Sequence, residues 1–596
     1  MTSLTVYGAQ LLRDGRSHRI LSGALHYFRV HPDQWARQLR MLHAMGLNTV
    51  ETYVPWNLHE RDEGRYDFEG LADLERFVAL ADREGLDVIV RPGPFICAEW
   101  ENGGLPAWLT ARTGTRIRCL DDTYLPAVDR WFDELIPRVA AMQHTRGGPV
   151  SMVQVENEYG SYGSDAAYLE HLRAGLVARG IDVPLFTSDG DEDWMLAGGT
   201  LPGVLATVNF GSRAGRAFAA LDKFRPDQPR ICMEFWDGWF DHWGEDHTER
   251  EPRDAENALR EILDHGGSVN LYMAQGGTSF GPWAGANRGG PVHDGEYQPT
   301  ITSYDYDAPI DERGDPTETY WRFRDALLGF RRSVGDESEV PDVPLRLPEL
   351  EEQAFRLVPV AGSAFAAAAG VSTSPVPTVE ELGLDQGVVI HTAVVSGPRA
   401  PLPLRVTGVH DRASVYAAGR LVGSGAGPVV EVPLPAVPAE GLRIDVVVET
   451  LGRVNYGPLV GEPKGITGHV MHERQVVHGW TSRAVRLDEL DRLARWDAAN
   501  EAVAEVAPLT LTGTFVAPQR ADTRLAVDGV DRGVAFVNGF CLGRFDAAGP
   551  QHSLYVPWPV VREGENTVTV VSLDPRTGTP THACARLVRG SGFIPA

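Results

Sequence analysis

At 596 residues the chain is longer than one hydrophobic core usually serves, so we expect several domains. Its 43% hydrophobic and 23% charged residues are typical of a globular protein, and no apolar run approaches the ~20 residues that span a bilayer. The net charge of −26 argues against nucleic acid or an anionic membrane as a partner, because both bind clustered basic residues. A neutral substrate fits this charge better.

The cysteines and the N-terminus bear on the cellular compartment. The five cysteines are odd in number, widely spaced and without a C-x-x-C pair, which predicts free thiols and no metal or redox site. The first 20 residues lack a basic segment followed by an uninterrupted apolar run and a small-residue cleavage site. We therefore expect a cytoplasmic protein.

From about residue 18 to residue 330, short apolar runs alternate with segments of helical period, as in β-α units around a parallel sheet. Eight strands are predicted: Ile20–Tyr27, Thr49–Pro55, Val88–Pro94, Val150–Asn157, Leu185–Ser188, Leu205–Asn209, Ile231–Phe235 and Val269–Ala274. Eight repeats over ~300 residues, without a glycine-rich nucleotide turn, predict a closed (β/α)8 TIM barrel and not an open doubly wound sheet.

Beyond the barrel the pattern changes to short β-branched strands separated by Gly and Pro turns, which is typical of β-sandwiches. The sequence RASVYAAGRLVG at 412–423 is echoed by RGVAFVNGFCLG at 532–543, and both share an arginine, an aromatic residue and two glycines at the same offsets. The spacing is about one sandwich domain. We predict a multidomain α/β plus all-β protein with a barrel at 1–330, a Pro- and acid-rich linker at 331–352, a β-sandwich at 353–495 and a jelly-roll sandwich at 496–596.

Carboxylates lie at two predicted strand ends. The stretch GGPVSMVQVENEYG (147–160) closes the fourth strand with Glu156, Asn157 and Glu158, and ICMEFWDGW places Glu234 at the end of the seventh. The carboxyl ends of barrel strands form the face that carries chemistry. Two carboxyl groups flanking a bound sugar are the minimal machinery for cleaving a glycosidic bond. The alternatives are solvated loop acids, or a Glu234 that only neutralises an arginine such as Arg91.

Aromatic residues gather after the same strands. Their faces pack against the apolar faces of pyranose rings, while acids and amides bond the hydroxyls, so this concentration favours a sugar pocket. The aromatic positions are Tyr53, Trp56, Trp100, Trp236, Trp239, Trp243, Tyr304 and Tyr306. No H-E-x-x-H motif, two-aspartate cluster with metal-like spacing or serine-centred elbow competes with these carboxylates, so neither metal nor acyl-enzyme chemistry is indicated.

The stretch GGPVSMVQVENEYG closely resembles the signature of glycoside hydrolase family 35, the β-galactosidases of lysosomal and bacterial type. Further segments carry the resemblance over nearly the whole chain: SGALHYFRV, TYVPWNLHE, RPGPFICAEWENGGLPAWL, MEFWDGWFDHWG, GGTSFG, TSYDYDAPIDERGD, FVNGFCLGRF and GPQHSLYVPWPVV. Ser279 departs from the asparagine usual in the family, which affects the expected outer pocket and leaving-group preference.

The resemblance implies a retaining double displacement with Glu158 as acid/base and Glu234 as nucleophile. It also implies galactose contacts at Tyr53, Ala98, Glu99, Asn157 and one tyrosine of SYDYDAP, for which we prefer Tyr306 over Tyr304. No metal or cofactor is implied. Glu156 is expected to point away from the substrate, into strand packing or a salt bridge.

The predicted function is therefore an exo-acting β-galactosidase that removes terminal β-galactose from oligosaccharides or glycosides. Two alternatives stay open: an exo-β-glucosaminidase or β-glucosidase with the same machinery, and a non-catalytic carbohydrate-binding protein. The sequence leaves open the linkage preference, the natural aglycone, the oligomeric state, including a homo-oligomer, and whether the sandwiches bind sugar. For the sandwiches we expect a supporting role.

Overall fold

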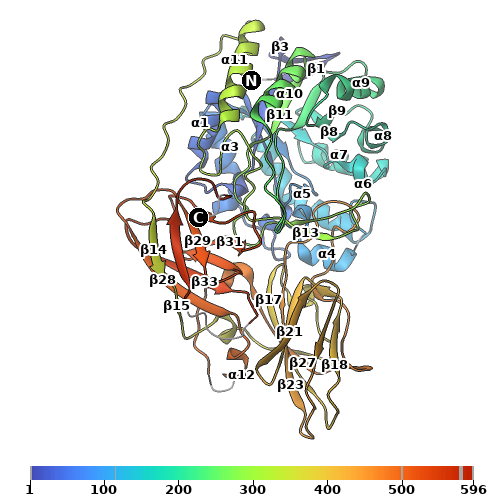
Figure 1. The fold of residues 1–596 in the computed structure, drawn as a ribbon. Coiled ribbons are helices and arrows are strands. Elements are labelled where there is room, and N and C mark those ends of the chain that lie inside the picture. The colour runs from blue at the N-terminus through green and yellow to red at the C-terminus, as the bar shows by residue number, and fades with distance from the viewer. Residues whose placement is uncertain (1–2, 115, 498–500, 576–581, 594–596) are drawn as a thin grey trace.

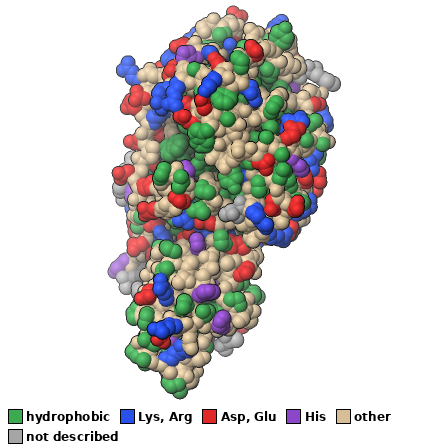
Figure 2. Space-filling view, turned by 90° about the vertical axis from the view of Figure 1, so that its right-hand side faces the viewer, with side chains coloured by type: hydrophobic (Ala, Val, Ile, Leu, Met, Phe, Trp, Pro, Cys, Tyr) green, Lys and Arg blue, Asp and Glu red, His purple; other side chains and the backbone are tan. Residues whose placement is uncertain are grey.

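The computed structural model describes residues 3–114, 116–497, 501–575 and 582–593. A barrel forms one end of the molecule and two β-sandwiches form the other (Figure 1). No helix in these ranges is long and apolar enough to cross a membrane. On the face shown in Figure 2, acidic and basic side chains are interspersed over both the barrel and the narrower sandwich lobe.

Eight parallel strands close into a barrel, and they are the eight that the sequence predicts. They are β4 (Leu21–Leu25), β5 (Thr49–Tyr53), β6 (Asp87–Arg91), β7 (Val150–Gln154), β8 (Leu185–Gly190), β9 (Leu205–Phe210), β10 (Ile231–Trp236) and β11 (Ser268–Gln275). Four of them, β4 to β7, end two or three residues before the predicted end. Beyond these ends the chain stays buried but leaves the sheet and runs in loops and short turns, so an apolar run alone does not mark where a strand ends.

Helices surround the strands. They are α1 (Trp35–Met45), α3 (Leu74–Arg83), α5 (Tyr124–Ala141), α7 (Ala166–Ala178), α9 (Ala214–Phe224), α10 (Pro252–Asp264) and α11 (Glu318–Ser333), with the shorter α2 (Trp56–His59), α4 (Ala107–Thr113), α6 (Tyr159–Tyr162) and α8 (Asp193–Gly199) in loops. Local signals set their ends: Asp165 caps α7 by accepting from Ala167 N and Tyr168 N, and Gly46 ends α1 with a left-handed φ of 106°.

A small antiparallel sheet closes the amino-terminal end of the barrel. It consists of β1 (Leu4–Tyr7), β2 (Gln10–Arg13) and β3 (Arg16–His18). Leu4 and Leu11 pack in one buried cluster with barrel residues such as Ile89, Met152 and Met233. A ligand therefore reaches the barrel axis from the carboxyl end.

The chain from α11 runs first to the C-terminal sandwich and only then to the other one (Figure 1). β14 (Gln353–Arg356) pairs with β34 (Cys584–Val588), and β15 (Val358–Pro359) pairs with β28 (Leu509–Ala517). Residues 353–359 thus contribute strands to the C-terminal sandwich, although the predicted domain limits place them in the first. Two- to four-residue edge strands carry no pattern that reveals a partner 150 or more residues away.

Each sandwich has two antiparallel sheets around an aliphatic core. The first contains β16 (Val371–Thr373), β27 (Trp480–Arg486), β17 (Gly387–Val395), β23 (Leu442–Glu449), β20 (Arg412–Ala417) and β21 (Arg420–Ala426), opposite β22 (Val429–Pro433), β18 (Pro403–Thr407), β25 (Val470–His472) and β26 (Gln475–Val476). The second contains β15, β28, β33 (Gly564–Ser572), β30 (Arg532–Val537) and β31 (Phe540–Asp546), opposite β14, β34, β29 (Thr523–Asp528) and β32 (Leu554–Val556).

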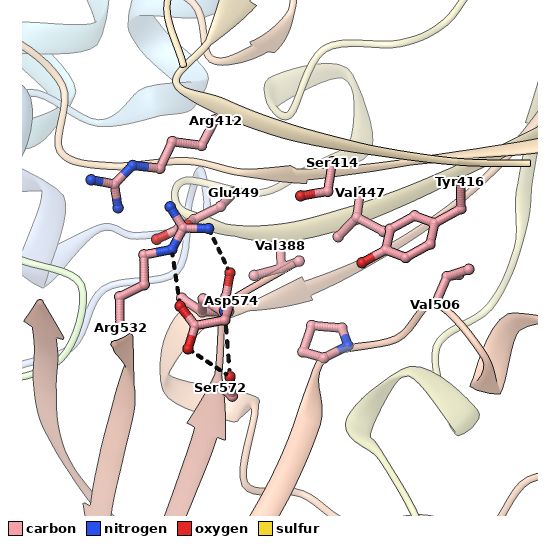
Figure 3. Close-up of a pocket in the computed structure, with 12 residues that line it drawn as sticks. Val388, Arg412, Ser414, Tyr416, Val447, Glu449, Val506, Arg532, Ser572 and Asp574 are labelled. Atoms are coloured by element: carbon pink, nitrogen blue, oxygen red, sulfur yellow. Dashed lines mark hydrogen bonds and ion pairs between the residues drawn. The ribbon is translucent and has the colours of Figure 1, made fainter. Parts of the chain in front are cut away.

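The internal sequence echo corresponds to two similar hairpins, β20–β21 and β30–β31. Each has its register shift at the same point, between Val415 and Tyr416 in one and between Ala535 and Phe536 in the other. Figure 3 shows the first arginine of each, Arg412 and Arg532, beside a small pocket between the two sandwiches. The hairpins therefore meet at the interface of the sandwiches.

A buried ionic network joins the first sandwich to the barrel. Arg453, which is fully buried, donates to Glu101 Oε1 at 2.5 Å and pairs with Glu380. Gln386 Nε2 donates to Glu101 Oε2 at 2.6 Å. Glu101 lies in the loop after β6, at the carboxyl face of the barrel, so this network connects the first sandwich to that loop.

We expect Arg453→Ala to destabilise the protein by about 3–5 kcal/mol, because the substitution leaves two buried carboxylates without their cation. Urea-induced unfolding measures this change. The matched control is Arg112→Ala, which removes the exposed pair with Glu63 and should cost less than about 1 kcal/mol. Equal losses in the two variants would contradict the structural role of the network.

Candidate active site

A cavity of about 290 Å³ opens at the carboxyl end of the barrel. All seven predicted site residues line it: Tyr53, Ala98, Glu99, Asn157, Glu158, Glu234 and Tyr306. They come from five strand ends or the loops that follow them, so the barrel closes around one site although the residues span about 250 positions of the chain.

The acid at the end of β7 is placed by an unusual backbone. Glu158 has a left-handed φ of 45°, and its N–H donates to Ser188 O at 3.1 Å. Gly160 N donates to Asp189 Oδ1 at 2.7 Å. Position 160 has to be glycine, because a Cβ there would lie 1.8 Å from Met195 O. The end of β8 thus fixes the turn that carries Glu158.

The Glu158 carboxyl is in a setting that favours its protonated form. Burial and the nearby Glu234 raise the pKa of Glu158 well above its usual value, while the hydrogen bond from Asn209 and the charge of Arg91 oppose the rise. The Asn209 Nδ2 donates to Glu158 Oε1 at 3.0 Å. Glu158 can therefore hold a proton near neutral pH.

Glu234 is held by three hydrogen-bond donors. Its Oε1 accepts from Arg91 Nη2 at 2.6 Å and from Tyr53 OH at 2.8 Å, and its Oε2 accepts from Trp236 Nε1 at 3.2 Å. Three donors, one of them a guanidinium, form a site for an ionised carboxylate. Glu234 does pair with Arg91, as one alternative proposed. It also lines the cavity, where a ligand can reach it, so neutralising Arg91 need not be its only role.

Glu156 is turned away from the cavity, as the sequence predicts. Arg118 donates to its two oxygens at 2.9 and 2.7 Å, and Tyr168 OH donates at 3.1 Å. Arg118 Nη2 also donates to Asn157 O at 2.6 Å. The buried pair therefore supports the backbone of the site residue next to it.

Polar groups that could bond sugar hydroxyls lie on the opposite wall. Cys97, Ala98 and Glu99 form a run of three left-handed residues that directs Glu99 into the cavity. Tyr304 OH donates to Glu99 Oε2 at 2.5 Å. Of Tyr304 and Tyr306, only Tyr306 lines the cavity, and its contact with galactose stays a prediction.

The site also contains residues that sequence reasoning did not identify. Tyr272, Tyr456 and His293 line the cavity, and Asn455 Nδ2 donates to Glu99 Oε1 at 3.4 Å. Tyr456 and Asn455 come from the first sandwich, and no sequence signal connects them to the barrel. Asn209 ends a predicted strand, so the rule that identified Glu158 and Glu234 could have found it.

We expect Tyr53→Phe to reduce kcat/KM for a cleaved substrate by roughly 10–100-fold, because its hydroxyl lies within hydrogen-bond distance of Glu234 Oε1 and Asn157 Oδ1 and donates its one proton to these acceptors. Steady-state kinetics measure the change. Tyr27→Phe is the control, since Tyr27 OH bonds His59 in the barrel and does not line the cavity. A Tyr53→Phe variant as active as the control would contradict the role of the hydroxyl.

The raised pKa of Glu158 also predicts how stability varies with pH. Between the ordinary pKa of glutamate and the raised pKa, the folded protein holds more protons than the unfolded chain, so stability falls as pH rises through this window. Glu158→Gln does not titrate. Its Tm, relative to that of the wild type, should therefore increase from about pH 5 to about pH 9. A constant difference in Tm across this range would contradict the assigned protonation.

Comparison with known proteins identifies the family of this chain. A family model described as Glycosyl hydrolases family 35 matches residues 10–329. Models described as the first all-beta domain and the galactose-binding domain of beta-galactosidase match residues 375–486 and 508–566. The chain is 40% identical to a beta-galactosidase of Xanthomonas manihotis (92% of this chain, 90% of that protein), 36% to one of Bos taurus (95% and 89%) and 37% to one of Homo sapiens (94% and 86%). The chain belongs to glycoside hydrolase family 35.

Proposed function

We propose that this protein is an exo-acting, retaining β-galactosidase that releases terminal β-D-galactose from oligosaccharides or glycosides. The observation that carries the proposal is the pair of unlike carboxyl groups in one cavity. Glu234 is bonded by a guanidinium, and Glu158 is buried in a setting that keeps its proton. The beta-galactosidases to which the chain is similar supply the sugar class.

In the first step, an oxygen of Glu234 attacks the anomeric carbon as its bond to the leaving oxygen breaks. Glu158 donates its proton to that oxygen, so the aglycone departs as a neutral alcohol. The product is a galactosyl ester of Glu234. Tyr53 and Arg91 donate to Oε1, which leaves Oε2 with the weaker bond from Trp236 and makes it the oxygen better able to attack.

In the second step, water displaces the Glu234 carboxylate from the anomeric carbon. Glu158, now ionised, removes a proton from a water molecule as the water oxygen bonds to the anomeric carbon, and the bond to Glu234 breaks. Two displacements restore the β-configuration. Both carboxyl groups return to their starting states, and no other reactant is needed.

The shape of the cavity supports action on chain ends. The amino-terminal end of the barrel is closed by the β1–β3 sheet, and Tyr456 of the first sandwich lines the cavity. A volume of about 290 Å³ is at the lower limit for small-molecule sites. This favours a terminal sugar with a short aglycone over the interior of a polysaccharide.

The test is a substrate panel with product anomers followed by proton NMR. Chromogenic β-galactoside should be cleaved much faster than the matching β-glucoside and β-N-acetylglucosaminide, with β-galactose as the first product. Preferred cleavage of the glucoside or glucosaminide would replace the sugar assignment, and α-galactose as the first product would overturn retention. Galactosyl disaccharides in the same panel report the linkage.

Two variants assign the roles of the carboxyl groups. Glu234→Gly should lose at least about 10⁴-fold in kcat on every galactoside, because it removes the nucleophile. Glu158→Ala should lose about 10²–10⁴-fold in kcat/KM on substrates that need protonation and much less in kcat/KM on a dinitrophenyl galactoside. Its kcat on the dinitrophenyl galactoside should fall because the second step lacks its base, and azide should restore this kcat by forming β-galactosyl azide. An active Glu234→Gly variant would contradict the assignment.

A further inference from the structure

Asn209 is bonded to one carboxyl group of the site and lies on the strand next to the other, and the proposed reaction does not use it. It is near the end of β9, in register with Glu234 on β10 and with Gly190 on β8. Its side chain is buried, and Nδ2 donates to Glu158 Oε1 at 3.0 Å. This amide is therefore directly bonded to the proposed proton donor.

The orientation of the amide is fixed by Ser188. Ser188 Oγ donates to Asn209 Oδ1 at 2.6 Å, which occupies the carbonyl and leaves Nδ2 facing Glu158. The reverse orientation would set two acceptor oxygens against each other whenever Glu158 is ionised. Ser188 also holds the backbone of the acid, because Glu158 N donates to Ser188 O at 3.1 Å. Ser188, Asn209 and Glu158 form a closed ring of hydrogen bonds.

Other charged and titratable groups face Glu158 from several elements. Glu234 on β10, Asp189 on β8, Cys97 after β6 and Tyr456 of the first sandwich all become more negative when they ionise. Arg91 on β6 is positive, but its hydrogen bonds go to Glu234, Asn157 and Gln154. The ionised form of Glu158, which the first step produces, thus depends on the Asn209 amide for direct hydrogen-bond support from a side chain.

We propose that Asn209, oriented by Ser188, is a positioning residue that aims the Glu158 carboxyl at the leaving oxygen and stabilises the carboxylate formed when the proton departs. The inference rests on the proposed function, in which Glu158 is the acid. A proton held too tightly is a poor catalyst, and a hydrogen bond to the conjugate base makes its transfer easier. The bond also fixes one rotamer of the carboxyl in the cavity.

The experiment compares Asn209→Ala, Ser188→Ala and Thr207→Val with the wild type. Thr207→Val is the matched control, because Thr207 Oγ1 donates to Thr187 O at 2.9 Å between the same two strands and does not contact Glu158. Each protein is assayed on methyl β-galactoside, whose leaving group needs a proton, and on dinitrophenyl β-galactoside, whose leaving group does not. The pH dependence of kcat/KM is recorded on the methyl galactoside.

For Asn209→Ala we expect the alkaline limb of the profile to move upward by about 0.5–1 pH unit, because the variant lacks a bond that favours the ionised acid. The kcat/KM on methyl galactoside should fall about 10–100-fold, and the kcat/KM on the dinitrophenyl galactoside should fall less than about threefold. Ser188→Ala should shift the alkaline limb and lower the activity on methyl galactoside in the same directions as Asn209→Ala, but by smaller amounts. Thr207→Val should leave the limb and the ratio of the two substrates unchanged.

An unmoved limb with equal losses on both substrates would overturn the inference and leave Asn209 a structural residue. If Asn209→Ala does not fold, the smaller change Ser188→Ala decides by the same criteria. A wild type that cleaves neither galactoside would instead overturn the proposed function, so the two failures are distinguishable.

Discussion

The site depends on one buried guanidinium, Arg91, placed on one carboxylate and not on the other. Two glutamates in the same dry cavity repel each other when both are ionised, so one of them tends to keep its proton, and their hydrogen-bond partners decide which one. Arg91 bonds Glu234 at 2.6 Å, while Glu158 receives an amide from Asn209. The barrel interior is arranged around this cation: Gln154 accepts from its Nε, and Glu51 lies 3.8 Å away. This asymmetry makes two identical side chains chemically different.

Several residues that hold these groups have backbone conformations that residues other than glycine rarely adopt. Cys97, Ala98, Glu99, Glu158 and Tyr306 all have φ between 45° and 65°, and all line the cavity. Such conformations persist only where surrounding contacts determine them. The first sandwich supplies part of that support: Arg453 bonds Glu101, just after the strained run, and Asn455 bonds Glu99 within it. The sandwich therefore belongs to the site and is more than an appended domain.

Much of this arrangement could be predicted from sequence because its signals are local. An apolar run bounded by turn residues marks a barrel strand, and the polar residue at its end marks the reactive face, so the strand pattern alone predicts that Glu158 and Glu234 share that face. The family resemblance, which implies that Glu158 is the acid, left Glu156 for strand packing or a salt bridge. What could not be predicted depends on contacts between distant segments. Tyr456 reaches the cavity from about 300 residues beyond Glu158, and β14 and β15 join a sandwich whose other strands begin 150 residues later. Short strands and single loop residues carry no pattern that names their partners.

In the proposed mechanism Glu234 forms a covalent bond to the sugar, while Glu158 donates and later removes the proton. The most direct measurement is trapping with a 2-deoxy-2-fluoro-β-galactosyl donor that has a good leaving group, which slows hydrolysis of the ester, followed by peptide mass spectrometry. The structure predicts one fluorogalactosyl group per chain, attached to Glu234 in the peptide that contains MEFWDGW, and loss of activity in step with labelling. A label on Glu158 or on another carboxylate, or complete inactivation without any label, would contradict the assignment of the two carboxyl groups.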